Sequence, residues 1–237
     1  MTSIESFTFN RCHKLSSITI GDNVTSIGDY AFYDCSSLTS VAVPNSVTSI
    51  GECAFKGCSS LSSIAIGNSV TTIGNGAFEG TAIYNDQSNW ENGVFYVGNY
   101  LIVANTNISG SYTIKEGTLM LVGNAFSNCT SLTSITIPNS VTEIGGTAFT
   151  GCSALTSIII PNSVKKIGKW AFNGCSALTS IVVVEGNPTY DSRENCNAII
   201  ETASHTLLVG CSKTTIPGGV TKIGDCAFKG CSALTSI

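Results

Sequence analysis

The sequence predicts a repeat solenoid of about ten turns, in which short parallel strands alternate with short α or 3₁₀ helical turns. Three observations support this fold class. A phenylalanine returns every 23 residues, an apolar alternation precedes it, and most cysteines stand three residues after it. A fixed period of roughly 20 to 50 residues indicates stacked supersecondary units. The phenylalanines with this spacing are Phe9, Phe32, Phe55 and Phe78 in a first run and Phe126, Phe149 and Phe172 in a second.

Each repeat begins with a strand. The stretch Leu38-Thr-Ser-Val41-Ala-Val43 follows the Leu-x-x-Leu-x-Leu pattern of leucine-rich repeats, and its last part alternates as a strand with one buried face does. Pro44-Asn45-Ser46 follows as a turn, because proline presets φ and asparagine tolerates turn geometry. Val47-Thr-Ser-Ile50 is then a short extended piece that returns the chain.

The segment around each phenylalanine is expected to be helical. Ala54, Cys58 and Leu61 lie at offsets of four and seven residues, which is a helical spacing. One or two turns of α or 3₁₀ helix are therefore predicted here. One such unit cannot bury its apolar face alone, so neighbouring repeats must stack to form the core.

The regular period fails twice. The repeat phenylalanine that follows Phe78 is Phe126, slightly more than two periods later. The one that follows Phe172 is Phe228, well beyond two periods later. Each gap is predicted to hold a degenerate turn with a β-hairpin. The strands expected are Val94–Val97 and Tyr100–Ala104 around Gly98-Asn99, then Asn197–Glu201 and Thr206–Gly210 around residues 202–205. The predicted organisation is one solenoid over 1–237, with regular repeats at 1–83, 114–183 and 214–237 and irregular turns at 84–113 and 184–213.

Both ends of the chain fall inside a repeat. Thr2-Ser3-Ile4 matches Thr48-Ser49-Ile50, and the chain stops at Leu234-Thr-Ser-Ile237. Solenoids usually close with atypical capping units, so we interpret the sequence as a stretch of a longer protein. A targeting signal and an anchor would lie outside it. Uncapped ends expose core side chains and strand edges, so self-association through them is expected.

The repeat resembles the BspA-like leucine-rich repeat family. Residues Leu155 to Cys175 carry its consensus, with Leu, Ile, Pro, Asn, Ser, Val, Gly, Ala, Phe and Cys in the expected places. The resemblance implies a right-handed α/β superhelix of the leucine-rich-repeat type. It also implies an adhesion or protein-interaction module of a cell-surface or secreted protein, which binds host matrix or cell-surface proteins. Fold alone does not fix function.

Composition argues against several classes of partner. Only 11% of residues are charged and the net charge is −4, so no face carries a dense basic stripe for nucleic acid. No apolar run reaches the roughly 18 residues of a membrane helix, so direct membrane insertion is not expected.

The 11 cysteines are expected to be free thiols. Seven of them share one repeat position and should stack as a buried column, where cysteine acts as a small hydrophobe. Parallel Cβ vectors make the disulfide torsion difficult to reach. Titration of the denatured protein should therefore find close to 11 thiols. The seven are Cys12, Cys35, Cys58, Cys129, Cys152, Cys175 and Cys231.

The sequence predicts no catalytic, cofactor-binding or metal-binding residue, and no cofactor. His13 and His205 are the only histidines and lie in unrelated elements. Cys53 and Cys58 lie five residues apart, but two separate repeat columns explain them. Most carboxylates occupy variable repeat positions, which are usually solvated, and no nucleophile elbow or phosphate loop occurs.

Positions that the repeat leaves free are the candidates for partner binding. The flanks of each phenylalanine vary between copies, the outer strand positions carry an apolar pair, and insertions on solenoids often lie on the binding face. The predicted partner-binding residues are Tyr30, Tyr33, Trp90, Tyr96, Ile159, Trp170, Val182 and Arg193, with Tyr100 and Tyr190 as further candidates.

Other interpretations stay open at this level. The aromatic residues in the two gaps could pack the hairpins onto the core, and the outer strand residues could reflect β propensity alone. The chain could also be a structural spacer that holds other domains apart. An enzyme that acts on polysaccharide is a third, more remote class, and it would require paired carboxylates about 5–9.5 Å apart in a groove.

Overall fold

Parallel strands from successive repeats form the frame of the structure, a computed structural model that describes residues 1–237. Ser40 lies opposite Ser63 and Val41 opposite Ile64, so the register equals the sequence period. Buried and exposed residues alternate along Ser40–Val43, as the sequence predicts. The fold class, a repeat solenoid, is confirmed, although the chain makes about eight turns instead of ten. The two gaps contain hairpins in place of regular turns, which accounts for the lower number.

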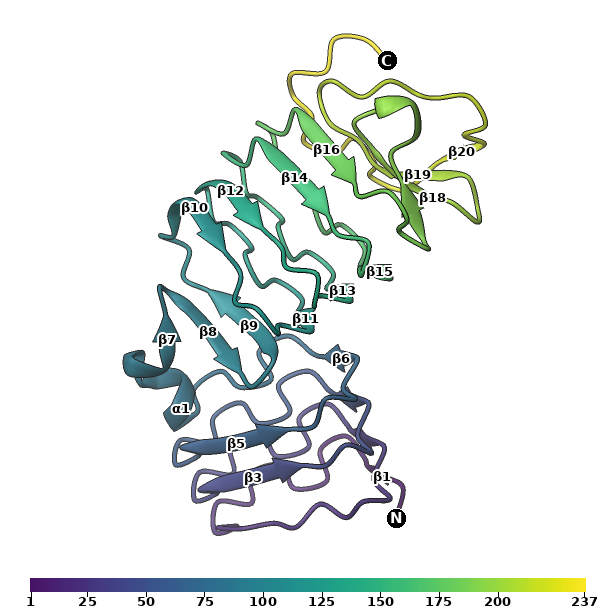
Figure 1. The fold of residues 1–237 in the computed structure, drawn as a ribbon. Coiled ribbons are helices and arrows are strands. Elements are labelled where there is room, and N and C mark those ends of the chain that lie inside the picture. The colour runs from purple at the N-terminus through teal and green to yellow at the C-terminus, as the bar shows by residue number, and fades with distance from the viewer. The chain divides into compact units, whose positions relative to one another are not determined.

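The chain divides into two compact units, Met1–Ile102 and Val103–Ile237. The single solenoid over 1–237 stays a prediction. In the first unit, β3 and β5 lie side by side, and the two-residue return strands form a second parallel set (Figure 1). The elements of this unit are β1 (Ser3–Ile4), β2 (Ser26–Ile27), β3 (Ser40–Val43), β4 (Ser49–Ile50), β5 (Ser63–Ile66), β6 (Thr72–Ile73), α1 (Ala82–Asn85), η1 (Gln87–Asn89), β7 (Trp90–Glu91), β8 (Val94–Val97) and β9 (Tyr100–Ala104), whose last two residues belong to the second unit.

In the second unit, β10, β12, β14 and β16 follow one another with the same direction, and the hairpin of β18 and β19 comes after them (Figure 1). The elements are β10 (Ser109–Thr113), β11 (Met120–Leu121), β12 (Ser131–Thr136), β13 (Glu143–Ile144), β14 (Ser157–Ile160), β15 (Lys166–Ile167), β16 (Ser180–Val183), β17 (Tyr190–Asp191), η2 (Arg193–Asn195), β18 (Ile199–Glu201), β19 (Thr206–Val209) and β20 (Lys222–Ile223).

Both predicted hairpins are present. β8 and β9 are neighbours joined by the turn at Gly98-Asn99. β18 and β19 pair in antiparallel fashion, with Glu201 opposite Thr206. The structure contains no helix with the length and hydrophobicity of a membrane span.

The segment around each phenylalanine is a run of hydrogen-bonded turns, not the helical turn that its spacing predicts. Lys56 N–H donates to Cys53 C=O at 3.1 Å inside the turn, whereas Phe55 N–H donates to Ala77 C=O of the next turn at 2.8 Å. A helix would use consecutive N–H groups internally. Because alternate N–H groups are committed to the neighbouring turn, the helix cannot form.

The phenylalanines form two columns of stacked rings in the core. Phe32, Phe55 and Phe78 are fully buried, and successive ring centroids are 5.1 and 5.9 Å apart. In the second unit Phe149 stacks between Phe126 at 5.4 Å and Phe172 at 5.2 Å. Buried aromatic residues contribute a large apolar area each, so the repeat period sets the core as well as the strands.

All 11 cysteines are free thiols in the structure. In the buried column the thiol donates to the carbonyl of the phenylalanine one turn earlier. Cys58 Sγ lies 3.0 Å from Phe32 O, and Cys152 Sγ lies 3.1 Å from Phe126 O. Burial raises the pKa of Cys58 to about 12, with a smaller contribution from Cys35. Burial likewise raises the pKa of Cys129 to about 11.

A glycine after most return strands allows the turns to approach one another. A Cβ on Gly51 would lie 2.4 Å from the backbone nitrogen of Asp29 in the previous turn. Such a contact cannot be relieved by a side-chain rotation, because it falls on the backbone. Gly21 replaces the turn proline, and no heavy atom lies within 4 Å of a Cβ built there.

We expect Gly51→Ala to lower the free energy of unfolding by about 3 kcal/mol, at the upper end of the usual range for overpacking. Gly21→Ala is the matched control and should change it by less than about 0.5 kcal/mol. Urea denaturation of the three proteins measures both values. Equal effects at the two positions would contradict the role of close approach.

We also expect stability to fall in alkaline solution. Between the ordinary thiol pKa of 9.0 and the raised value of about 12 for Cys58, the folded chain keeps a proton that the unfolded chain loses. The stabilisation is therefore complete below about pH 9 and decreases as the pH rises, by about 1.4 kcal/mol per pH unit for each such thiol. Urea denaturation under reducing conditions at pH 8, 9 and 10 measures the slope.

Cys58→Ala should make that slope shallower by one thiol, whereas Cys12→Ala, which removes an exposed thiol, should leave it unchanged. A slope that is the same in all three proteins would rule out the buried column as its source.

Candidate functional site

The backbone is left-handed two residues before the phenylalanine of each turn and again two residues after it. At the first of these positions φ is 55° at Tyr30 and 60° at Trp170. Asparagine and glycine adopt this conformation readily, and they occupy the first position in two turns. Elsewhere the chain places bulky side chains there, at a cost of about 1–2 kcal/mol each. The residues at this position are Phe7, Tyr30, Cys53 and Gly76 in the first unit and Asn124, Thr147, Trp170 and Cys226 in the second.

In the first unit Phe7 and Tyr30 at this position form an aromatic array with Tyr33, which directly follows the phenylalanine of its turn. Phe7 is 58% exposed and stacks on Tyr30 with ring centroids 5.1 Å apart and nearly parallel planes. Tyr30 also contacts Tyr33, with centroids at 5.6 Å. A hydrogen bond with the Cys53 side chain is the main cause that raises the pKa of Tyr30, and Glu52 adds to it. The array is therefore a half-exposed apolar surface beside acidic groups.

The outer strand face of the second unit carries an apolar strip. Ile159 on β14 and Val182 on β16 are directly paired residues, 57% and 43% exposed. Val184 extends the strip beyond the end of β16 and is 38% exposed. The two residues predicted from the sequence thus lie together on one surface.

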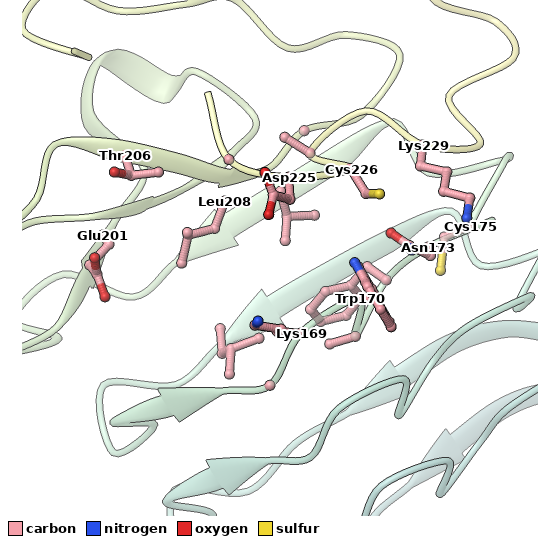
Figure 2. A pocket seen from close by; sticks show the side chains of 18 of the residues that line it. Lys169, Trp170, Asn173, Cys175, Glu201, Thr206, Leu208, Asp225, Cys226 and Lys229 are labelled. Atoms are coloured by element: carbon pink, nitrogen blue, oxygen red, sulfur yellow. The ribbon is translucent and has the colours of Figure 1, made fainter. Parts of the chain in front are cut away.

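A pocket of about 390 Å³ lies in the second unit beside Trp170. Figure 2 shows Lys169 and Trp170 on one wall and Leu208, Asp225 and Cys226 on the facing segments. Trp170 is 52% exposed, so its indole is available to a ligand in the pocket. Apolar and charged side chains share the lining, and no group of three or more His, Cys, Asp or Glu side chains is placed to hold a metal ion.

The predicted aromatic residues of the first gap mostly pack the hairpin. Trp90 is half-buried, its Nε1–H donates to Tyr84 C=O at 2.8 Å, and its ring contacts Phe95. Tyr96 is only 8% exposed. Tyr100 is fully buried, and its hydroxyl donates to Gly67 C=O at 2.7 Å. This placement fits the packing alternative, because little of these rings is left for a partner.

The second gap contains a salt bridge between Arg193 and Asp191. Arg193 Nε and Nη2 donate to the two carboxylate oxygens of Asp191 at 2.7 and 2.5 Å, and this hydrogen bonding lowers the pKa of Asp191. Thr202 also donates to Asp191. Tyr190 is buried, and its hydroxyl accepts from Ile167 N–H at 2.9 Å. Arg193 is therefore already paired within the chain, and its predicted role as a partner contact is untested.

Sequence reasoning missed Phe7, the left-handed positions and the pocket. A signal for the backbone was present, because Gly76 and Asn124 occupy the same repeat position as Tyr30. Recurrent glycine and asparagine at one position favour a positive φ. The pocket has no such signal, since its walls come from separate segments of the chain, one around Trp170 and others around Leu208 and Cys226.

Comparisons with known proteins agree with this geometry. The family model for the BspA type leucine-rich repeat region matches six copies, over residues 1–109, 103–206 and 199–237. The chain belongs to this family. None of the curated proteins matches the sequence.

Solved structures include other leucine-rich repeat proteins of bacteria. A leucine-rich cell surface protein from Faecalibacterium prausnitzii A2-165 is 30% identical to this BspA-type chain, with a TM-score of 0.50. The match covers 98% of this chain but 61% of that one, so the chain spans less than two thirds of its length. A leucine-rich repeat protein from Eubacterium ventriosum is 22% identical, with a TM-score of 0.46, and the match covers 91% of this chain and 79% of that one.

Trp170→Gly is expected to be more stable than Trp170→Ala by about 1–2 kcal/mol, because both remove the indole but only glycine relieves the left-handed strain. At Lys169, which lacks a positive φ, the order should reverse, with alanine better by about 0.5–1 kcal/mol. Thermal or urea denaturation of the four variants gives the comparison. The same order at both positions would show that residue 170 is not strained.

Proposed function

We propose that the chain is a non-catalytic protein-interaction module of a cell-surface or secreted bacterial protein, which adheres to host or neighbouring-cell proteins. The BspA-type repeat supports the interaction module. The name of the Faecalibacterium prausnitzii relative, a cell surface protein, supports an extracellular location.

The observation that carries the proposal is the exposed aromatic array of Phe7, Tyr30 and Tyr33. Stacking contributes to the order of the array, but the left-handed backbone at Phe7 and Tyr30 has a cost that glycine would avoid. Phe7 keeps more than half of its surface in solvent, at 58% exposure. Rigid aromatic side chains with few rotamers are typical anchors of protein interfaces. Strain retained around such a surface is characteristic of functional sites.

The experiment compares adhesion of the chain and of the triple variant Phe7→Ala, Tyr30→Asn, Tyr33→Ser. Asparagine is chosen at position 30 because it tolerates the positive φ found there. Fluorescent beads that carry each protein are applied to immobilised fibronectin, collagen and epithelial cells. We expect the triple variant to lose at least about tenfold in binding, because hot-spot aromatic residues contribute about 2 kcal/mol or more.

Ile216→Thr removes an exposed apolar side chain of the second unit and is the matched control, with binding unchanged. Unchanged adhesion of the triple variant would instead support a structural spacer. Failure of the unmodified chain to bind any of these surfaces would argue against host adhesion.

A further inference from the structure

The stack of turns in the second unit opens between the turn of Phe172 and the turn of Phe228. One turn earlier, Thr147 N–H donates to Lys169 C=O at 3.0 Å and Phe149 N–H donates to Ala171 C=O at 2.7 Å. The equivalent N–H groups of Trp170 and Phe172 have no acceptor in the protein. Two backbone donors with the spacing i and i+2 are therefore unpaired on the side where the pocket lies.

The opening is a wedge. At its closed end Gly174 N–H donates to Lys229 C=O at 3.1 Å, and a Cβ on Gly230 would lie 2.6 Å from Gly174 Cα. At the other end the hairpin strand β19 intervenes. Gly210 N–H donates to Ala227 C=O, so the carbonyl expected to pair with Phe172 is already occupied.

The unpaired donors have a defined chemistry. Phe172 is only 5% exposed, so its N–H is largely removed from water and carries a desolvation penalty. Donors at i and i+2 on one side of a chain are what a strand edge offers to an extended segment. A sugar could stack on the indole of Trp170, but its ring hydroxyls do not match the spacing of the N–H donors at Trp170 and Phe172.

The rest of the pocket fits one apolar side chain of a ligand, because its walls are apolar and charged side chains also line it. Trp170 and Leu208 supply apolar surface on opposite walls (Figure 2). Lys169, Glu201 and Asp225 supply charge at the same pocket. The volume of about 390 Å³ is within the range of roughly 300–1,000 Å³ that ligand pockets occupy.

We propose that this pocket binds an extended peptide segment of a partner protein. Main-chain carbonyl oxygens of the peptide accept hydrogen bonds from Trp170 N–H and Phe172 N–H, and one apolar side chain packs between Trp170 and Leu208. The inference rests on the proposed interaction function but assigns a site in the second unit, separate from the aromatic array. The ligand supplies the pairing that the turn of Phe149 receives from its successor.

The test starts with a random heptapeptide library displayed on phage and selected on the full chain. Selected peptides are synthesised, and their affinities are measured for the chain, for Trp170→Gly and for Leu208→Trp, which fills the pocket. We expect each variant to weaken binding at least tenfold. Trp170→Gly suits the positive φ at this position, so the loss would not come from unfolding. Thr147→Gly alters the same repeat position one turn earlier, outside the pocket lining, and should bind peptide normally.

Amide hydrogen exchange measured by NMR supplies a readout of the hydrogen bonds themselves. In the free chain the Phe172 amide should exchange faster than the Phe149 amide, which is already bonded to Ala171 C=O. Bound peptide should slow the exchange of Phe172 and leave Phe149 unchanged.

Three results would overturn the proposal. They are the absence of any selected peptide that binds, binding that is indifferent to both pocket variants, and peptide binding without protection of the Phe172 amide. A glycan that binds at Trp170 and leaves the Phe172 amide unprotected would reassign the pocket to carbohydrate. The proposed adhesion function is tested with variants of the first unit, whereas peptide binding is tested with variants of the pocket. Either proposal can therefore fail while the other holds.

Discussion

The structure depends on backbone hydrogen bonds between successive turns of the chain. Phe55 N–H reaches Ala77 C=O, and Gly51 N–H reaches Ile27 C=O, each at 2.8 Å. These bonds form only when every turn has the same length and shape and lies close to its neighbours. That requirement explains the constant repeat period, the glycine that permits backbone contact at Gly51, and the alternation of internal and external hydrogen bonds around each phenylalanine. Side-chain stacking follows from it, because identical turns bring identical residues together.

The same constraint separates structural positions from those free for function. Phe55 and Cys58 point into the stack and are fully buried, whereas the left-handed residue between them and the return strand projects a side chain outward in several turns. Glycine adopts the backbone conformation at this position without strain, as at Gly76. Phe7, Tyr30 and Trp170 therefore stand at a position where the backbone favours glycine but the chain carries an aromatic ring. The strain is local and small compared with the burial of the core, so the stack tolerates it.

The sequence was sufficient for features that depend on period and alternation. The strand at Ser40–Val43 and the hairpin around Gly98-Asn99 were predicted because their residues carry the signal locally. The prediction of a helical turn at Ala54 was wrong. Apolar residues at offsets of four and seven also occur in a run of turns whose alternate N–H groups donate to the next repeat. The burial of Tyr96 could not be read from its strand alone, since it depends on what packs against β8.

The pocket shows how an insertion opens the stack of turns at one place in a repeat protein. Gly210 N–H donates to Ala227 C=O, and Gly210 C=O accepts from Cys231 Sγ at 3.4 Å, which are two of the bonds that the phenylalanine backbone makes in a regular turn. Gly210 thus takes the backbone role of the missing phenylalanine but has no ring. The Phe228 ring occupies part of that space, because a Cβ on Gly210 would lie 2.2 Å from it. The aromatic column therefore ends at Phe172, and the turn that should cover its N–H group is displaced. A degenerate repeat that keeps the hydrogen bonds and omits the side chain is enough to convert a closed stack into an open pocket.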